Sequence, residues 1–114
     1  MTLKISKRNV DQVTILDTAG RLTIGEGDIV LRDSIHENLN AGTRNLLVNL
    51  ANISTIDESG IGELVSAYVT ASNRGGKLKL VNLPPKIRDV LMITQLITVF
   101  EVYDNEQEAV ASFG

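Results

Sequence analysis

The sequence contains no cysteine and no tryptophan, and its single histidine is His36. The absence of cysteine excludes disulfides and thiolate metal sites. One histidine among scattered carboxylates does not make a ligand cluster, so we expect neither a metal nor a cofactor. Aromatic residues make up only 4% of the chain and the net charge is -3. We expect no nucleic-acid partner, because such a partner would require a basic face or a stacking platform.

Long apolar segments are also missing. No run approaches the roughly 20 apolar residues needed to cross a bilayer, and residues 1–5 begin no long apolar region of the kind that signal peptides carry. We therefore expect a cytoplasmic protein without membrane insertion. The length of 114 residues suits one domain, which we expect to span residues 1–114.

Periodic apolar residues predict strands that alternate with helices. Leu31, Ile35 and Leu39 recur every four residues, which places them on one helical face. The nearly all-apolar run Leu46–Leu50 is typical of a strand covered on both faces. The predicted order is β-β-α-β-α-β-α-β-α, which implies an α/β fold with a mixed sheet of about four to five strands. The strands are expected at residues 3–6, 13–16, 46–50, 77–81 and 97–102, with a polar turn over residues 8–12.

Capping and stop residues mark the ends of the predicted helices. Thr23 and Glu26 fit a capping box that would start the first helix, and Asn40–Gly42 would end it. The later helices are expected from Ile61 to Ser72, from Pro84–Pro85 onward and over residues 106–113.

A strand, a tight turn and a helix start meet in one short stretch, Ile56-Asp57-Glu58-Ser59-Gly60-Ile61-Gly62. Helix capping explains its polar residues, because Asp57 or Ser59 would supply the N-cap oxygen and Glu58 would complement the helix dipole. Thr55 with Glu58 also fits a capping box, so the helix start stays open by a few residues.

Capping does not explain the two glycines of this stretch. Gly60 and Gly62 each cost about 1 kcal/mol of helix propensity relative to alanine. Small residues at a helix start let another backbone or a nucleotide approach closely. We therefore predict a contact site here.

Three kinds of chemistry are disfavoured. A catalytic serine needs a base within hydrogen-bond reach, but His36 lies off the apolar face of its helix and is expected to be exposed; the Gly-x-Ser-x-Gly pattern is also absent. A phosphoacceptor at Asp57 would need an acidic pair after the first strand, where Ser6-Lys7-Arg8 stands. Gly25-Glu26-Gly27 lacks the third glycine of a dinucleotide-binding loop. We expect no enzymatic activity.

The order of elements, the Gly20-Arg21-Leu22 turn and the Asp57–Gly62 motif resemble the STAS domain family, and within it the bacterial anti-sigma factor antagonists. The resemblance covers almost the whole chain. Two positions differ from the family pattern: Glu58 stands where the family often has a small residue, and Thr23 where it often has aspartate.

The resemblance implies a switch rather than a catalyst. Such proteins bind an anti-sigma factor that is also a serine kinase, and thereby free a sigma factor. The kinase phosphorylates the serine before the glycine, here Ser59, and a serine phosphatase removes the phosphate. The alternative is a STAS module in a stress-signalling complex or a transporter assembly, without regulation at Ser59. The partner-binding surface is expected to include the exposed turn between Gly20 and Thr23 and to comprise Arg21, Thr23, Asp57, Glu58, Gly60, Ile61 and Gly62.

Overall fold

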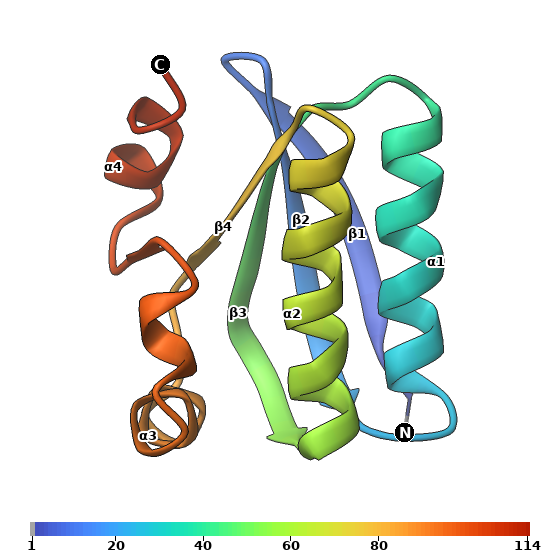
Figure 1. Cartoon of the computed structure of the whole chain (residues 1–114), viewed down its shortest axis with the longest axis vertical. Coiled ribbons are helices and arrows are strands. Elements are labelled where there is room, and N and C mark those ends of the chain that lie inside the picture. The colour runs from blue at the N-terminus through green and yellow to red at the C-terminus, as the bar shows by residue number, and fades with distance from the viewer. Residues whose placement is uncertain (1) are drawn as a thin grey trace.

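A computed structural model describes residues 2–114, and within them the strands form one five-stranded sheet in the order β1-β2-β3-β4-β5 (Figure 1). β1 and β2 are antiparallel, whereas every later pair is parallel. The predicted α/β fold with a mixed sheet is therefore confirmed. The elements are β1 (Lys4–Val10), β2 (Val13–Leu22), α1 (Gly27–Asn40), β3 (Asn45–Ile56), α2 (Glu58–Asn73), β4 (Lys77–Val81), α3 (Pro85–Ile93), the 3-10 helix Leu96–Thr98, β5 (Val102–Tyr103) and α4 (Glu106–Ala111).

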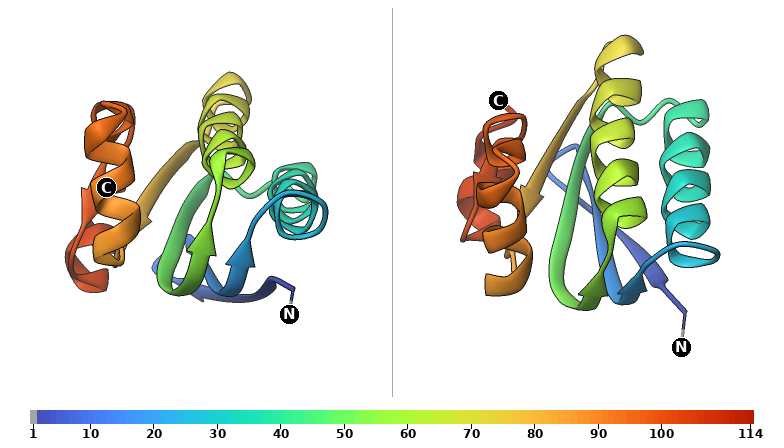
Figure 2. Two further views of the ribbon diagram at one scale, coloured as in Figure 1. Left: turned by 90° about the horizontal axis from the view of Figure 1, so that it is seen from below. Right: turned by 60° about the horizontal axis from the view of Figure 1, so that its bottom comes forward.

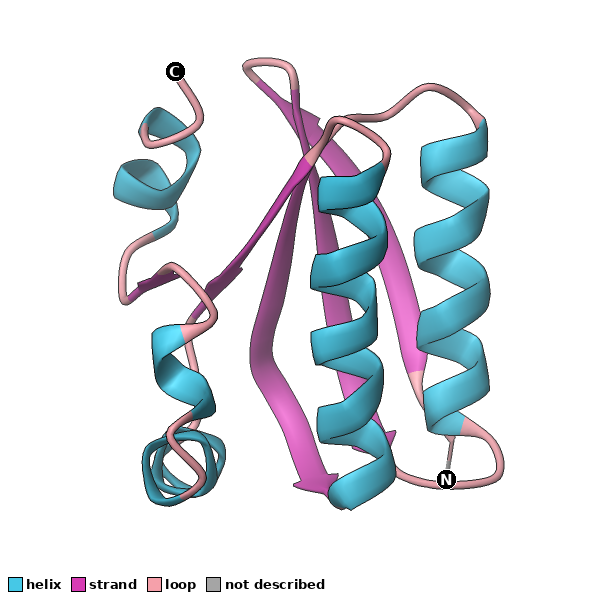
Figure 3. Ribbon diagram, viewed as in Figure 1, coloured by secondary structure: helices cyan, strands magenta, loops and turns pink. Residues whose placement is uncertain are grey.

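Helices α1 and α2 lie side by side on one face of the sheet, as Figures 1 and 2 show from three directions. Helices α3 and α4 lie next to β4 and β5, at the opposite end of the strand order from β1 (Figure 3). The predicted apolar face of α1 is confirmed, because Leu31, Ile35 and Leu39 are all buried. No helix among residues 2–114 has the length and apolarity that a membrane crossing needs.

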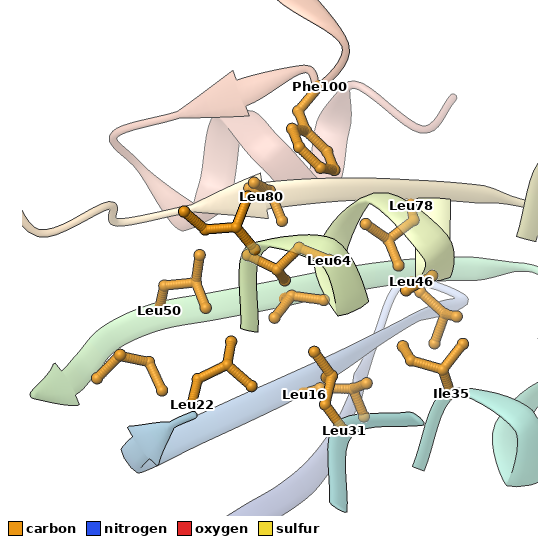
Figure 4. Close-up of a cluster of buried hydrophobic side chains, with 14 of the residues drawn as sticks. Leu16, Leu22, Leu31, Ile35, Leu46, Leu50, Leu64, Leu78, Leu80 and Phe100 are labelled. Atoms are coloured by element: carbon orange, nitrogen blue, oxygen red, sulfur yellow. The ribbon is translucent and has the colours of Figure 1, made fainter. Parts of the chain in front are cut away.

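The main hydrophobic core lies between the sheet and helices α1 and α2. Leu31 of α1 and Leu64 of α2 pack in the same buried cluster as Leu16 of β2 and Leu46 of β3 (Figure 4). A smaller cluster joins α4 to the strands through Val13, Ile15, Leu47, Val81, Ala109 and Val110. Burial on both sides explains why the middle of β3 is almost entirely apolar.

The strands near the N-terminus are longer than expected. β1 continues through Arg8 and Asn9 to Val10, so the turn is reduced to Asp11 and Gln12, which adopt positive φ angles of 49° and 67°. Among residues 2–114, β1 pairs only with β2. Polar residues suit such an edge strand because part of it faces water. The prediction of a polar turn over residues 8–12 was therefore wrong for residues 8–10 and correct for Asp11 and Gln12.

The predicted fifth strand was also wrong over most of its length. Residues 97–102 were expected to be extended, but Leu96–Thr98 form a 3-10 helix and β5 covers only Val102–Tyr103. Gln95 enters this segment with a φ of 63°. The apolar side chains of Ile97 and Val99 pack against the main core, which explains an apolar run that does not pair as a strand.

Candidate functional site

The two longest strands bring two helix starts to the same edge of the sheet. β2 and β3 are parallel and their last paired residues are Leu22 and Ile56. After Leu22 the chain makes a loop, Thr23–Glu26, before α1 begins at Gly27. After Ile56 it enters α2 almost at once. We call residues 23–26 the 23–26 loop.

Asp57 connects the start of α2 to the 23–26 loop. Its Oδ1 accepts a hydrogen bond of 2.9 Å from the backbone N–H of Gly60, so Asp57 is the N-cap of α2. Its Oδ2 accepts a hydrogen bond of 2.9 Å from the N–H of Ile24. Of the two N-cap candidates, Asp57 is therefore the one that the structure uses. One carboxylate caps a helix and also holds the loop of the neighbouring crossover.

Ser59 lies in the first turn of α2 and is half-buried. Its Oγ donates a hydrogen bond of 2.7 Å to Oδ2 of Asp28, which is 6% exposed. Oδ1 of Asp28 accepts hydrogen bonds from the N–H groups of Gly25, at 3.1 Å, and Ile29, at 2.8 Å. The hydroxyl of Ser59 is thus held by a buried carboxylate that also fixes the loop.

Asp28 was missed in reasoning from the sequence. The capping box expected from Thr23 and Glu26 does not form, because α1 begins later, at Gly27, and Glu26 makes no side-chain cap bond. The only sequence signal for Asp28 was an acidic residue in the first turn of a helix, which ordinarily complements the helix dipole. Its bond to Ser59 depends on the parallel placement of β2 and β3.

The two glycines of the motif have different surroundings. A Cβ on Gly60 would lie 2.1 Å from the carbonyl oxygen of Leu22 and 2.9 Å from Cγ1 of Ile56. Gly60 therefore allows α2 to approach the backbone of this chain's own β2. A Cβ on Gly62 would meet nothing within 4 Å, and Gly62 is exposed. The close approach predicted from the sequence therefore occurs at Gly60, between α2 and β2 of this same chain.

The other expected site residues are divided between the surface and the interior. Arg21 and Glu58 are exposed, Thr23 is half-buried, and Ile61 packs in the main core. Gly20–Leu22 do not form a turn, because they are the last residues of β2; the turn is the 23–26 loop. This loop carries Ile24, whose side chain is 74% exposed.

The hydroxyl of Ser59 is hydrogen-bonded to a carboxylate, that of Asp28, and not to a histidine. His36 is exposed on α1, as predicted. Within the described residues, no group of three or more histidine, cysteine or acidic side chains could hold a metal ion.

Backbone hydrogen bonds lower the pKa of Asp57, first that from Ile24 and then that from Gly60. A carboxyl whose pKa is lower in the folded than in the unfolded chain stabilises the fold above its unfolded pKa of about 3.9. This contribution is lost as the pH falls through the folded value. We expect Asp57→Asn to be less stable than the wild type at pH 7, and the difference to shrink below about pH 4.

Urea unfolding between pH 2 and pH 7 measures this difference. Asp33→Asn removes an exposed carboxylate from α1 and corrects for the general loss of one charge. A constant difference between the wild type and Asp57→Asn across this pH range would contradict the contribution assigned to Asp57.

Comparison with known proteins agrees with the fold and identifies a family. The family model described as STAS domain matches residues 4–109. A Thermotoga maritima protein named "Putative anti-sigma factor antagonist" is 30% identical over 100 residues, which cover 88% of each chain. A crystal structure from the same species, with the same description, has a TM-score of 0.87 at 28% identity and covers 95% of this chain and 92% of that one.

A more distant structure shares the fold. It is the Bacillus cell fate determinant SpoIIAA in the phosphorylated form, with a TM-score of 0.74 at 19% identity, covering 97% of this chain and 100% of that one. Because the family model spans nearly all of the sheet and its helices, the chain belongs to the STAS domain family.

Proposed function

We propose that this protein is an anti-sigma factor antagonist. It binds an anti-sigma factor that is also a serine kinase, frees the sigma factor, and is switched off when Ser59 is phosphorylated. The observation that carries the proposal is the position of Ser59, which is half-buried in the N-terminal turn of α2, next to exposed Glu58 and Gly62. The description of the Thermotoga maritima relative supports the antagonist role.

The proposed partner surface surrounds Ser59 at this end of the sheet. Glu58 and Gly62 present it from α2, and Arg21, Thr23 and Ile24 present it from the end of β2 and the 23–26 loop. Asp57, Gly60 and Ile61 shape it from beneath, because they cap α2, fit it against β2 and anchor it in the core. The exposed side chain of Ile24 supplies an apolar contact of the kind that protein interfaces bury.

Phosphorylation changes the charge of this surface. Phosphoryl transfer from a nucleoside triphosphate forms a bond between Oγ of Ser59 and phosphorus, breaks the bond to the nucleoside diphosphate, and releases the Oγ proton. The product carries about -1.5 to -2 charges. The dipole of α2 favours this charge by about 0.3–1 kcal/mol, whereas burying an unpaired dianion in an interface costs several kcal/mol. The partner is therefore released, and a serine phosphatase restores binding.

Recovery of the tagged protein from its native cell tests the proposal, with mass spectrometry of the bound proteins and of the peptide that carries Ser59. We expect an anti-sigma factor with a kinase domain, and a phosphorylated fraction at Ser59. Transporter subunits or a stress-signalling complex, with unmodified Ser59, would favour the adaptor role instead. Hydrolysis of a generic ester that is lost in Ser59→Ala would contradict the absence of catalysis.

A further inference from the structure

We propose that Asp28 transmits the modification of Ser59 to the 23–26 loop, so that phosphorylation loosens this loop as well as adding charge. This inference rests on the proposed phosphorylation of Ser59 and concerns what happens inside the domain. Asp28 carries it because its two carboxylate oxygens face different groups: Oδ2 accepts from the Ser59 hydroxyl, and Oδ1 accepts from the N–H groups of Gly25 and Ile29.

The 23–26 loop is held by hydrogen bonds at its first three residues, Thr23, Ile24 and Gly25. The N–H of Asp28 donates to the carbonyl oxygen of Thr23 at 3.0 Å, the N–H of Gly25 donates to the Asp28 side chain, and the N–H of Ile24 donates to Asp57. Two of these three bonds involve Asp28, which is almost completely buried. One of them is made by the Asp28 side chain, so the position of Gly25 in the loop depends on where that side chain lies.

Esterification of Ser59 removes the hydrogen that its Oγ donates to Asp28. In place of a donor at 2.7 Å, Oδ2 of Asp28 then faces a dianionic phosphate with no proton to give. A buried carboxylate beside a like charge, and without its hydrogen-bond donor, is strongly destabilised. Relief requires the Asp28 side chain to turn away from Ser59, and its second oxygen then leaves Gly25 and Ile29.

Ile24 extends this effect to the surface. It precedes Gly25 in the same short loop. Its side chain is the most exposed apolar side chain of the proposed partner surface. Phosphorylation would thus act twice on a bound partner. It places a dianion in the interface, and it breaks the hydrogen bond between Asp28 and the loop that carries Ile24.

Protein carrying phosphoserine at position 59, incorporated during synthesis, tests the coupling without any partner. Amide hydrogen exchange is measured by NMR at Gly25 and Ile29. We expect exchange at both amides to be at least about tenfold faster than in the unmodified protein, because local opening becomes easier. The amide of Leu64, in the middle of α2, reports on the whole fold and should change far less.

Matched variants separate the role of Asp28 from a general effect of charge. Asp28→Asn keeps an oxygen that accepts from Gly25 and Ile29 but carries no charge, and its amide can donate to a phosphate. In Asp28→Asn the effect of phosphoserine 59 on exchange should therefore fall to less than about twofold. Phosphoserine at Ser66, which is exposed on α2, should leave Gly25 and Ile29 unchanged.

Equal exchange at Gly25 and Ile29 with and without phosphoserine 59 would overturn the coupling, and so would an undiminished effect in Asp28→Asn. Thermal unfolding of each protein shows whether the variants are folded. If phosphoserine 59 unfolds the whole domain, Ser59→Ala removes the same donor without a charge. A smaller acceleration is then expected at the same two amides, and its absence would also overturn the coupling. Partner release is measured separately, so failure of the coupling leaves the proposed function standing.

Discussion

Gly60→Ala is expected to lower the free energy of unfolding by about 3 kcal/mol, even after a gain of about 1 kcal/mol in helix propensity. The added Cβ would lie 2.1 Å from the carbonyl oxygen of Leu22 and 2.9 Å from Cγ of the same residue. The carbonyl belongs to the backbone of β2, which also pairs with β3 at Ile56. The clash can therefore be relieved only by moving α2 away from the sheet, which would also strain the bond between Asp57 and Ile24.

Gly62→Ala is the matched control for this experiment. It lies two residues further along the same helix, and its Cβ would meet nothing within 4 Å. Alanine should therefore stabilise the protein by up to about 1 kcal/mol, since only helix propensity changes. Urea unfolding followed by circular dichroism measures both variants. Similar destabilisation by the two substitutions would mean that α2 does not rest on β2 as described.

Ser59→Asp is expected to weaken binding of the anti-sigma factor by about 100-fold. An unpaired charge buried in an interface costs several kcal/mol, and about 1.4 kcal/mol corresponds to a tenfold change in affinity. Aspartate has no hydroxyl, so it both adds charge and abolishes the hydrogen bond to Asp28. Isothermal titration calorimetry with the anti-sigma factor recovered from the cell measures the loss.

Two further variants define what the charge contributes. Ser59→Ala blocks modification without adding charge, and its affinity should stay within a few-fold of the wild type. Ser66→Asp adds the same charge at an exposed position further along α2 and should bind as the wild type does. Comparable affinity for Ser59→Asp and the wild type would contradict a switch based on charge.

Local patterns predicted the part of the site that is contiguous in sequence. The sequence limited the N-cap of α2 to Asp57 or Ser59, and the structure shows that it is Asp57, whose contact with Gly60 spans three residues. The order of strands and helices could likewise be predicted, because periodicity and stop residues are local signals. The STAS resemblance followed from this order together with the Gly20-Arg21-Leu22 segment and the Asp57–Gly62 motif.

Contacts between distant segments could not be predicted in this way. The hydrogen bond between Ser59 and Asp28 joins residues 31 positions apart, and nothing near Asp28 in the sequence distinguishes it from an ordinary acidic residue at a helix start. The role of Gly60 was predicted only as close approach by another backbone or a nucleotide, and the structure shows the backbone of β2 at that position. Strand ends were misplaced where polar edge residues pair, as in β1.

The bonds from Ser59 to Asp28 and from Ile24 to Asp57 span 31 and 33 positions of the chain. They can form only after α1 has crossed over and set β3 beside β2, because both depend on that parallel pairing. In a nascent chain, Ser59 is a serine in an ordinary flexible peptide. A partner or kinase that recognises the assembled geometry would therefore also distinguish folded from unfolded copies of the domain, and unfolded copies would take no part in the proposed switch.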